Sequence, residues 1–158
     1  MVLRTKERHL LVHIDDLGSA AAASASTSAT SVPLSLSDVH HTIRDAVHRH
    51  VSGVTSNTAA GDAAAQSLQT KHYAPHAQLV MVRVPLAQSR GVREAIRLVK
   101  LSKQRPVQMS VIRAFGNAVV ARRELARRLE AALHNSTDGK AQKRIRSTLD
   151  TLLEFHKR

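Results

Sequence analysis

The sequence lacks cysteine and tryptophan, and its aromatic side chains are one tyrosine and two phenylalanines. Without cysteine the chain can form neither a disulfide nor a thiolate-ligated metal site. Aromatic residues make up 2% of a 158-residue chain that is 42% hydrophobic, so its core must be aliphatic. Apolar stretches such as 79–84 are far too short to span a membrane. Together with the length, these absences predict a soluble protein with a single domain over 1–158.

Acidic residues are also scarce. The chain has 24 lysines and arginines against 12 aspartates and glutamates, a formal net charge of +12. Between 66 and 115 nine lysines and arginines face a single acid, Glu94. Such an excess favours a polyanionic partner, and nucleic acid is the leading candidate. A basic surface that engages no partner is the alternative.

Catalytic and metal-binding motifs are missing. The sequence contains no glycine-rich phosphate loop and no G-x-S-x-G motif. Asp15 and Asp16 are neighbours in a predicted strand and face opposite ways, which argues against a shared acid–base site. Histidines crowd the segment 40–50, but no His-Glu-x-x-His motif accompanies them. We therefore expect no catalytic residues, no metal site and no cofactor bound by the protein itself.

Apolar spacing predicts an α+β domain. Strands are expected at 6–14, 68–73, 77–84 and 106–115, and helices at 35–53, from 89, at 118–133 and at 137–155. This β-α-β-β-α-β order is the ferredoxin-like arrangement of RNA-recognition motifs, here with two additional C-terminal helices. The strand at 77–84 is apolar on both faces, which indicates that helices cover both sides of the sheet.

Two segments lack a periodic apolar face. Residues 19–32 are almost purely alanine, serine and threonine, which predicts a disordered insertion. Residues 54–65 are small and polar and predict a flexible loop.

A strand-to-helix junction lies at Gly116, with Asn117 as the predicted helix cap. Before it, alternation predicts that Val107, Met109, Val111 and Phe115 share one face of the strand. After it, helical spacing predicts a packed face made by Ala118, Leu125, Leu129 and Ala132.

The arginines of the same predicted helix divide between its two sides. Arg123 and Arg127 fall opposite the packed face, free to meet RNA. Arg122 projects among the apolar residues, so it either extends past the sheet edge or reaches a phosphate near the helix start.

The chain lacks the sheet aromatics on which RNA-recognition motifs stack bases, so we expect recognition of RNA shape and backbone. Tyr73 could stack on a base, but a place in the core or at the rim of the sheet is the favoured interpretation. For Arg93, Arg97 and Lys100 a solvated helix face is an equal alternative to RNA contact. The candidate RNA-binding residues are Arg4, Lys6, Arg8, Lys71, Arg83, Arg93, Arg97, Arg113, Asn117, Arg122, Arg123, Arg127 and Arg128.

Several motifs occur in an order that resembles one family. They are the segments 1–11, 43–47, 71–73 and 82–85 and the junction at Gly116. Together they resemble the small "processing of precursors, five" protein subunit family of ribonuclease P and ribonuclease MRP. The junction departs from the Ser-Gly-Thr-Ile usual in that family, because it reads Phe-Gly-Asn-Ala here.

The resemblance implies a ferredoxin-like core that pairs with the TIM-barrel protein subunit of the same complex. It also implies contact with the catalytic RNA, which would itself use Mg²⁺ to cleave precursor tRNA, and a location in the nucleus and nucleolus. The leading hypothesis is a non-catalytic subunit that binds and stabilises this RNA for processing of tRNA 5′ ends and of rRNA. A ribosomal or ribosome-assembly RNA-binding protein is the alternative, and an enzyme of ferredoxin-like fold is the third hypothesis.

Overall fold

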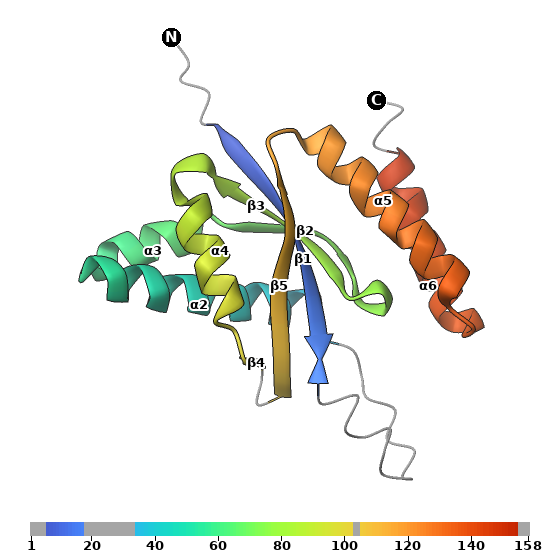
Figure 1. Cartoon of the computed structure of the whole chain (residues 1–158), viewed down its shortest axis with the longest axis horizontal. Coiled ribbons are helices and arrows are strands. Elements are labelled where there is room, and N and C mark those ends of the chain that lie inside the picture. The colour runs from blue at the N-terminus through green and yellow to red at the C-terminus, as the bar shows by residue number, and fades with distance from the viewer. Residues whose placement is uncertain (1–5, 18–33, 103–104, 155–158) are drawn as a thin grey trace.

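The computed structural model describes residues 6–17, 34–102 and 105–154. Five strands form one sheet in the order β2-β3-β1-β5-β4, and each neighbouring pair is antiparallel (Figure 1). The elements are β1 (Glu7–Asp16), α2 (Leu36–Thr55), α3 (Thr58–Ser67), β2 (Gln69–Ala74), η1 (Pro75–Ala77), β3 (Leu79–Pro85), η2 (Leu86–Gln88), α4 (Ser89–Arg97), β4 (Leu101–Ser102), β5 (Arg105–Phe115), α5 (Ala118–Asn135) and α6 (Gly139–Glu154).

The strand order β2-β3-β1-β5, with α2 and α4 in the two crossovers, is the ferredoxin-like core predicted from the sequence. Two further helices, α5 and α6, follow it as expected. The two-residue strand β4 was not predicted and extends only one edge of the sheet. Within the described ranges no helix is long and apolar enough to cross a membrane.

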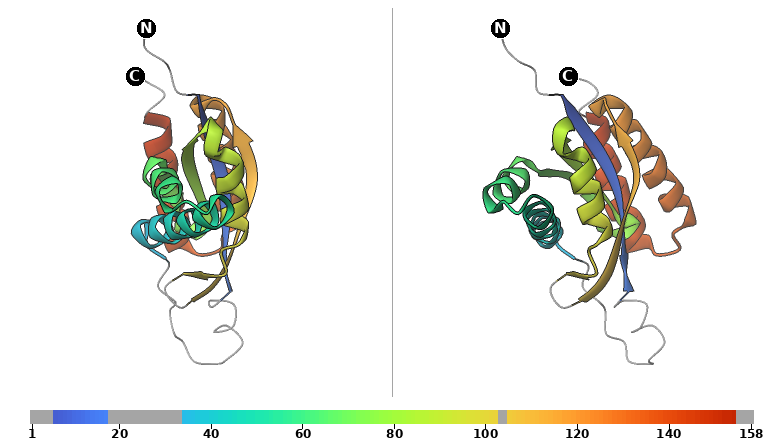
Figure 2. Two further views of the ribbon diagram at one scale, coloured as in Figure 1. Left: turned by 90° about the vertical axis from the view of Figure 1, so that its left-hand side faces the viewer. Right: turned by 60° about the vertical axis from the view of Figure 1, so that its left-hand side comes forward.

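Helices cover both faces of the sheet (Figure 2). On one face, α2 and α4 pack on buried side chains such as Leu10 and Val12 of β1, and we call this the first core. On the other face, α5 and α6 pack on Leu11 of β1 and on Met81, and we call this the second core. Strand β3 contributes alternate residues to the two cores, which confirms the two-sided apolar pattern read from its sequence.

A β-bulge makes β5 change faces. Val12 pairs with Val111 and Leu11 pairs with Arg113, so Ile112 is the extra residue. Val107 and Met109 therefore belong to the first core, while Phe115 belongs to the second. The prediction that Phe115 shares a face with the others was wrong, because a bulge shifts the two-residue period by one.

The predicted flexible loop at 54–65 is helical instead: α2 continues to Thr55, and α3 begins at Thr58. The Asn57 side chain caps α3 by accepting hydrogen bonds from two backbone N–H groups at its start. Gly61 lies so close to α2 that an added Cβ would meet the Ser52 Oγ at 2.0 Å. Alanine packing and the cap order this segment, which lacks the apolar period used to predict helices. The other segment expected to lack structure, 19–32, lies outside the described residues.

Two local details concern α6 and α4. Leu153 of α6 is 49% exposed, so the buried stripe of that helix is formed by the side chains of Ile145, Leu149 and Leu152. Helix α4 begins after the short η2 turn, and the Ser89 hydroxyl donates to the Leu86 carbonyl rather than capping α4.

Candidate nucleic-acid interface

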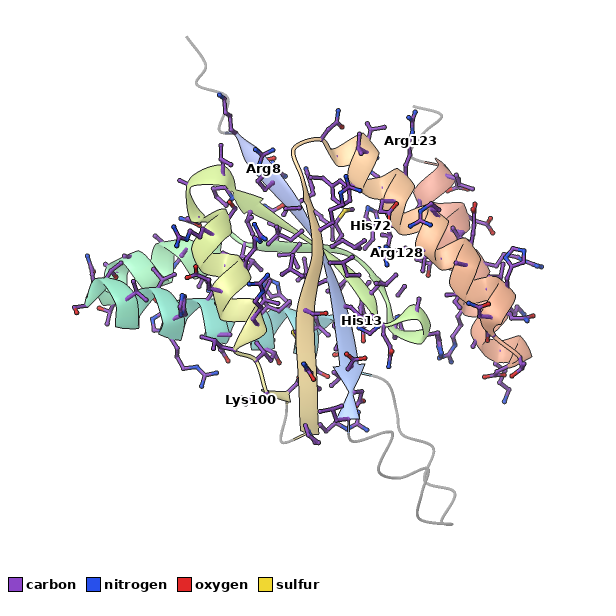
Figure 3. The ribbon with its side chains drawn as sticks, in the orientation of Figure 1. Arg8, His13, His72, Lys100, Arg123 and Arg128 are labelled. Carbon is purple, nitrogen blue, oxygen red and sulfur yellow. The ribbon has the colours of Figure 1, made fainter. Side chains whose placement is uncertain are left out.

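A cavity of about 370 Å³ lies on the α5 side of the sheet, between β1, β2, β3 and the first turn of α5. Figure 3 shows His72 between the sheet and this helix. We call it the sheet cavity, and its lining consists of Glu7, His9, Lys71, His72, Met81, Arg83, Ala118 and Arg122.

The lining side chains come together through strand alternation and register. Every second residue of a strand points to the same face of the sheet. Glu7 and His9 of β1 therefore share the face of Leu11, which belongs to the second core. His9 is the direct pairing partner of Arg83 in the neighbouring strand β3. The first turn of α5 forms another wall of the cavity, because Ala118 and Arg122 lie one helical turn apart.

Strand β2 carries a bulge at the cavity. Thr70 pairs with Val82 and Tyr73 pairs with Val80, so Lys71 and His72 together oppose the single residue Met81. Neighbouring residues of a regular strand point to opposite faces, but a bulge re-aims them. As a result both Lys71 and His72 line the same cavity.

Arg83 is balanced by a carboxylate. Its Nε donates to Glu7 Oε2 at 2.6 Å, and its Nη2 donates to the second oxygen of the same carboxylate. Its Nη1 also donates to Gln69 Oε1 at 3.4 Å. The hydrogen bond from Arg83 lowers the pKa of Glu7, and the same bond raises the pKa of Arg83. The positive charge of Arg83 is therefore largely balanced by Glu7, and the role of this pair is to hold the cavity wall in place.

Lys71 and Arg122 are cations of the cavity lining for which the described residues provide no ion pair, although the charge of Lys71 also helps to lower the pKa of Glu7. Among the described residues, no carboxylate lies within ion-pair distance of either side chain. Burial is the main cause that lowers the pKa of His72, and the charges of Arg122 and Lys71 lower it further. Burial likewise lowers the pKa of His9, with Glu7 opposing and Arg83 and Arg122 reinforcing the shift. Both imidazoles of the cavity thus have lowered pKa values and lie near cationic side chains.

One polar atom at the cavity has no partner. The Nδ1 atom of His9 is buried and makes no hydrogen bond to any described residue. A buried nitrogen without a partner costs free energy unless a ligand or solvent satisfies it.

Elsewhere on α5, Glu124 binds two arginines. Arg127 donates two hydrogen bonds to its carboxylate, at 2.9 and 2.8 Å, and Arg128 donates a third at 2.9 Å. These bonds lower the pKa of Glu124 to about 2. Arg127 lies on the exposed side of the helix as expected, and i,i+3 and i,i+4 spacing brings it and Arg128 to one acid. Its contact with RNA stays a prediction. Arg123 is exposed and has no such partner among the described residues.

The remaining candidates near the junction have local roles. The Arg113 guanidinium lies 5.5 Å from the centre of the Phe115 ring, a cation–π contact. The Asn117 side chain accepts a hydrogen bond from the Val119 N–H at 2.7 Å, which confirms it as the cap of α5. Gly116 leaves room for Arg8, because an added Cβ would lie 2.3 Å from the Arg8 Nη1. Lys6 is exposed, and Arg4 lies outside the described residues.

Arg93 and Arg97 do not join the sheet cavity. Both are exposed on α4, whose buried residues belong to the first core on the opposite face of the sheet. The candidate residues therefore form two separate basic surfaces, and the sheet cavity belongs to the one at α5.

Tyr73 has a structural position. Its ring packs against the first core, and its hydroxyl donates to the Leu34 carbonyl at 2.9 Å. Burial raises the pKa of this hydroxyl to about 12. The favoured interpretation of Tyr73 as a core or rim residue is confirmed.

Sequence reasoning missed His9 and His72 as site residues, and it missed Glu124 as the partner of two arginines. The alternation of β1 was sufficient to place His9 on the face of Leu11. No local pattern revealed the bulge that turns His72 toward the cavity. In the described ranges, no group of three or more histidines and acids could hold a metal ion.

Comparisons with known proteins bear on the identity of the chain. The model of the Rpp14/Pop5 family matches residues 8–126, from β1 into α5. A comparison with curated protein sequences gave no match. Among solved structures, a chain in the cryo-EM structure of yeast ribonuclease MRP is similar, with 10% sequence identity and a TM-score of 0.49. The similarity covers 86% of this chain and 100% of that chain. Because the family model spans most of the chain, this protein belongs to the Rpp14/Pop5 family, and the resemblance inferred from its motifs is confirmed.

Proposed function

We propose that this chain is a non-catalytic protein subunit of ribonuclease P or ribonuclease MRP that binds and stabilises the catalytic RNA. Membership of the Rpp14/Pop5 family is the observation that carries the proposal. The net charge of +12 supports it, because phosphate contacts by lysine and arginine supply most of the sequence-independent affinity for RNA. The missing sheet aromatics favour contacts to folded RNA over stacking on single-stranded bases.

In this proposal the RNA performs the cleavage of precursor tRNA, and Mg²⁺ is held by the RNA rather than by this chain. The chain pairs with the TIM-barrel protein subunit of the same complex, in the nucleus and nucleolus. The basic surface around the sheet cavity and α5 meets the RNA. The separate pair Arg93 and Arg97 on α4 is the second surface available for RNA or for another subunit.

The deciding experiment is affinity purification of the tagged chain from its native cells, with sequencing of bound RNA and mass spectrometry of bound proteins. We expect ribonuclease P RNA or ribonuclease MRP RNA, together with a TIM-barrel subunit. Recovery of ribosomal RNA alone would instead support a ribosome-assembly protein and overturn the proposal. Incubating the purified chain with precursor tRNA provides the second arm, and cleavage in the absence of any other RNA would contradict the non-catalytic role.

A further inference from the structure

We propose that the sheet cavity seats one phosphate group of the RNA backbone between Lys71 and Arg122, and that His9 and His72 take up protons as the phosphate enters. This inference rests on the proposed RNA-binding function and assigns part of it to one site. The ligand is a phosphodiester, and its binding depends on pH.

The walls of the cavity suit an anion. Lys71 and Arg122 come from β2 and α5, and neither has a carboxylate partner among the described residues. Glu7 is the one acid of the lining, and Arg83 already engages both of its oxygens. Ala118 is the first residue of α5, so the positive end of the helix dipole lies at the cavity wall.

The bulge in β2 supports a binding role. A regular strand would direct Lys71 and His72 to opposite faces, whereas here both line one cavity. Bulges recur next to functional sites, because they re-aim a side chain at the expense of regular pairing.

The charges around each imidazole predict the direction of the pH dependence. Glu7, Arg83 and Arg122 act on His9, and Arg122 and Lys71 act on His72. In the free protein burial is the main cause that lowers both histidine pKa values; neighbouring cations lower them further, and Glu7 opposes the shift at His9. A seated phosphodiester attracts the protonated imidazole and so raises both pKa values. Binding then takes up protons, and affinity rises as the pH falls from neutral through the histidine range.

The first test uses sulfate, whose charge stays constant between pH 5 and 8. Proton NMR of the full chain would follow the histidine Cε1 protons with and without sulfate, with His9→Gln and His72→Gln used for assignment. We expect sulfate to raise the pKa of His9 and His72, and the Cε1 signal of His134, at the far end of α5, serves as the control that sulfate does not affect. The response should disappear in Arg122→Gln and persist in Arg123→Gln, the exposed neighbouring position. Unchanged titration of both cavity histidines would overturn the inference.

The second test uses RNA. Binding of ribonuclease P RNA or ribonuclease MRP RNA would be measured at pH 6 and pH 7.5 over a range of salt. We expect Arg122→Gln to flatten the log–log salt slope by about 0.7 to 0.9, the value for one lost phosphate contact. We expect the gain in affinity at pH 6 to shrink in His9→Gln/His72→Gln and to remain in His134→Gln. Circular dichroism spectra would verify that each variant is folded.

The outcomes separate this inference from the proposed function. RNA binding that is unaffected by Arg122→Gln and by the double histidine variant would sink the cavity inference and leave the RNA-binding role intact. Failure of the wild-type protein to bind either RNA would count against both. Sulfate binding that RNA does not displace would identify a site for a free anion and refute the backbone phosphate.

Discussion

Glu124 holds Arg127 and Arg128 at once, and this single carboxylate sets much of the charge that α5 presents. Its pKa lies near 2 in the folded chain, against an ordinary value of 4.5. A carboxyl whose pKa is lowered by folding stabilises the protein above its ordinary pKa and loses that contribution as the pH falls through the folded value. We therefore expect wild type to be more stable than Glu124→Gln at pH 6, with the difference vanishing toward pH 2.

Thermal unfolding of both proteins between pH 2 and pH 7 would measure this difference. Glu130→Gln, an exposed change on the same helix, is the matched control and should show little difference at any pH. A stability difference between wild type and Glu124→Gln that stays constant down to pH 2 would contradict the assigned pKa.

The same substitution should strengthen RNA binding if the surface formed by Arg127 and Arg128 meets RNA. Glu124→Gln removes one negative charge and releases two guanidinium groups, so we expect higher affinity and a steeper salt dependence. Glu130→Gln removes an equal charge without releasing an arginine, and it should give the smaller effect. Equal gains in the two variants would mean that Arg127 and Arg128 do not contact RNA.

At the level of helices and strands, the close approach of α3 to α2 depends on Gly61. A Cβ there would meet the Ser52 Oγ at 2.0 Å and the His48 carbonyl oxygen at 2.8 Å. Because the second contact is with backbone, we expect Gly61→Ala to lower the free energy of unfolding by about 1–3 kcal/mol, the usual cost of overpacking. Gly53, within α2, has open space around its Cβ position, and Gly53→Ala should raise stability by about 0.5–1 kcal/mol.

Urea unfolding of both variants would check this pair of opposite signs. If Gly61→Ala were as stable as wild type, α3 would be able to shift away from α2 without cost. A flexible loop at 54–65 would give the same result.

For the molecule as a whole, the question is whether α5 and α6 belong to the same folding unit as the ferredoxin-like core. Leu10 and Leu11 are neighbours in β1, both 0% exposed, and they belong to the first and second cores respectively. If the helices on both faces of the sheet are needed for the fold, Leu10→Ala and Leu11→Ala should each lower the free energy of unfolding by about 2–5 kcal/mol. Chemical denaturation followed by circular dichroism would measure both, and a near-neutral Leu11→Ala would mean that α5 and α6 are an independent attachment.

The separation of the basic residues also belongs to the whole molecule. Arg93 and Arg97 on α4 lie across the sheet from Lys71 and Arg122, although the sequence presents most of them as one basic block. Figure 1 shows α4 and α5 on opposite sides of the sheet. A single RNA surface that includes all of them would have to wrap around the domain.

Much of this architecture could be predicted from the sequence because its signals are local. Alternating apolar residues identified β1 and β3, helical spacing identified α2 and α5, and Asn117 marked the cap between strand and helix. The order of these elements was enough for the ferredoxin-like core. Helical spacing also contained the pairing of Glu124 with Arg127 and Arg128, a signal that the prediction did not use.

The tertiary structure alone decided the features that depend on register and on contacts between distant segments. The bulge at Ile112 places Phe115 in the second core, and the bulge in β2 directs the side chains of both Lys71 and His72 toward the sheet cavity. Helix α3, which has no clear apolar period, is ordered by packing against α2. The physical reason is common to these cases: propensity and periodicity act over a few residues, whereas strand register and helix packing depend on the fit of side chains far apart in the chain.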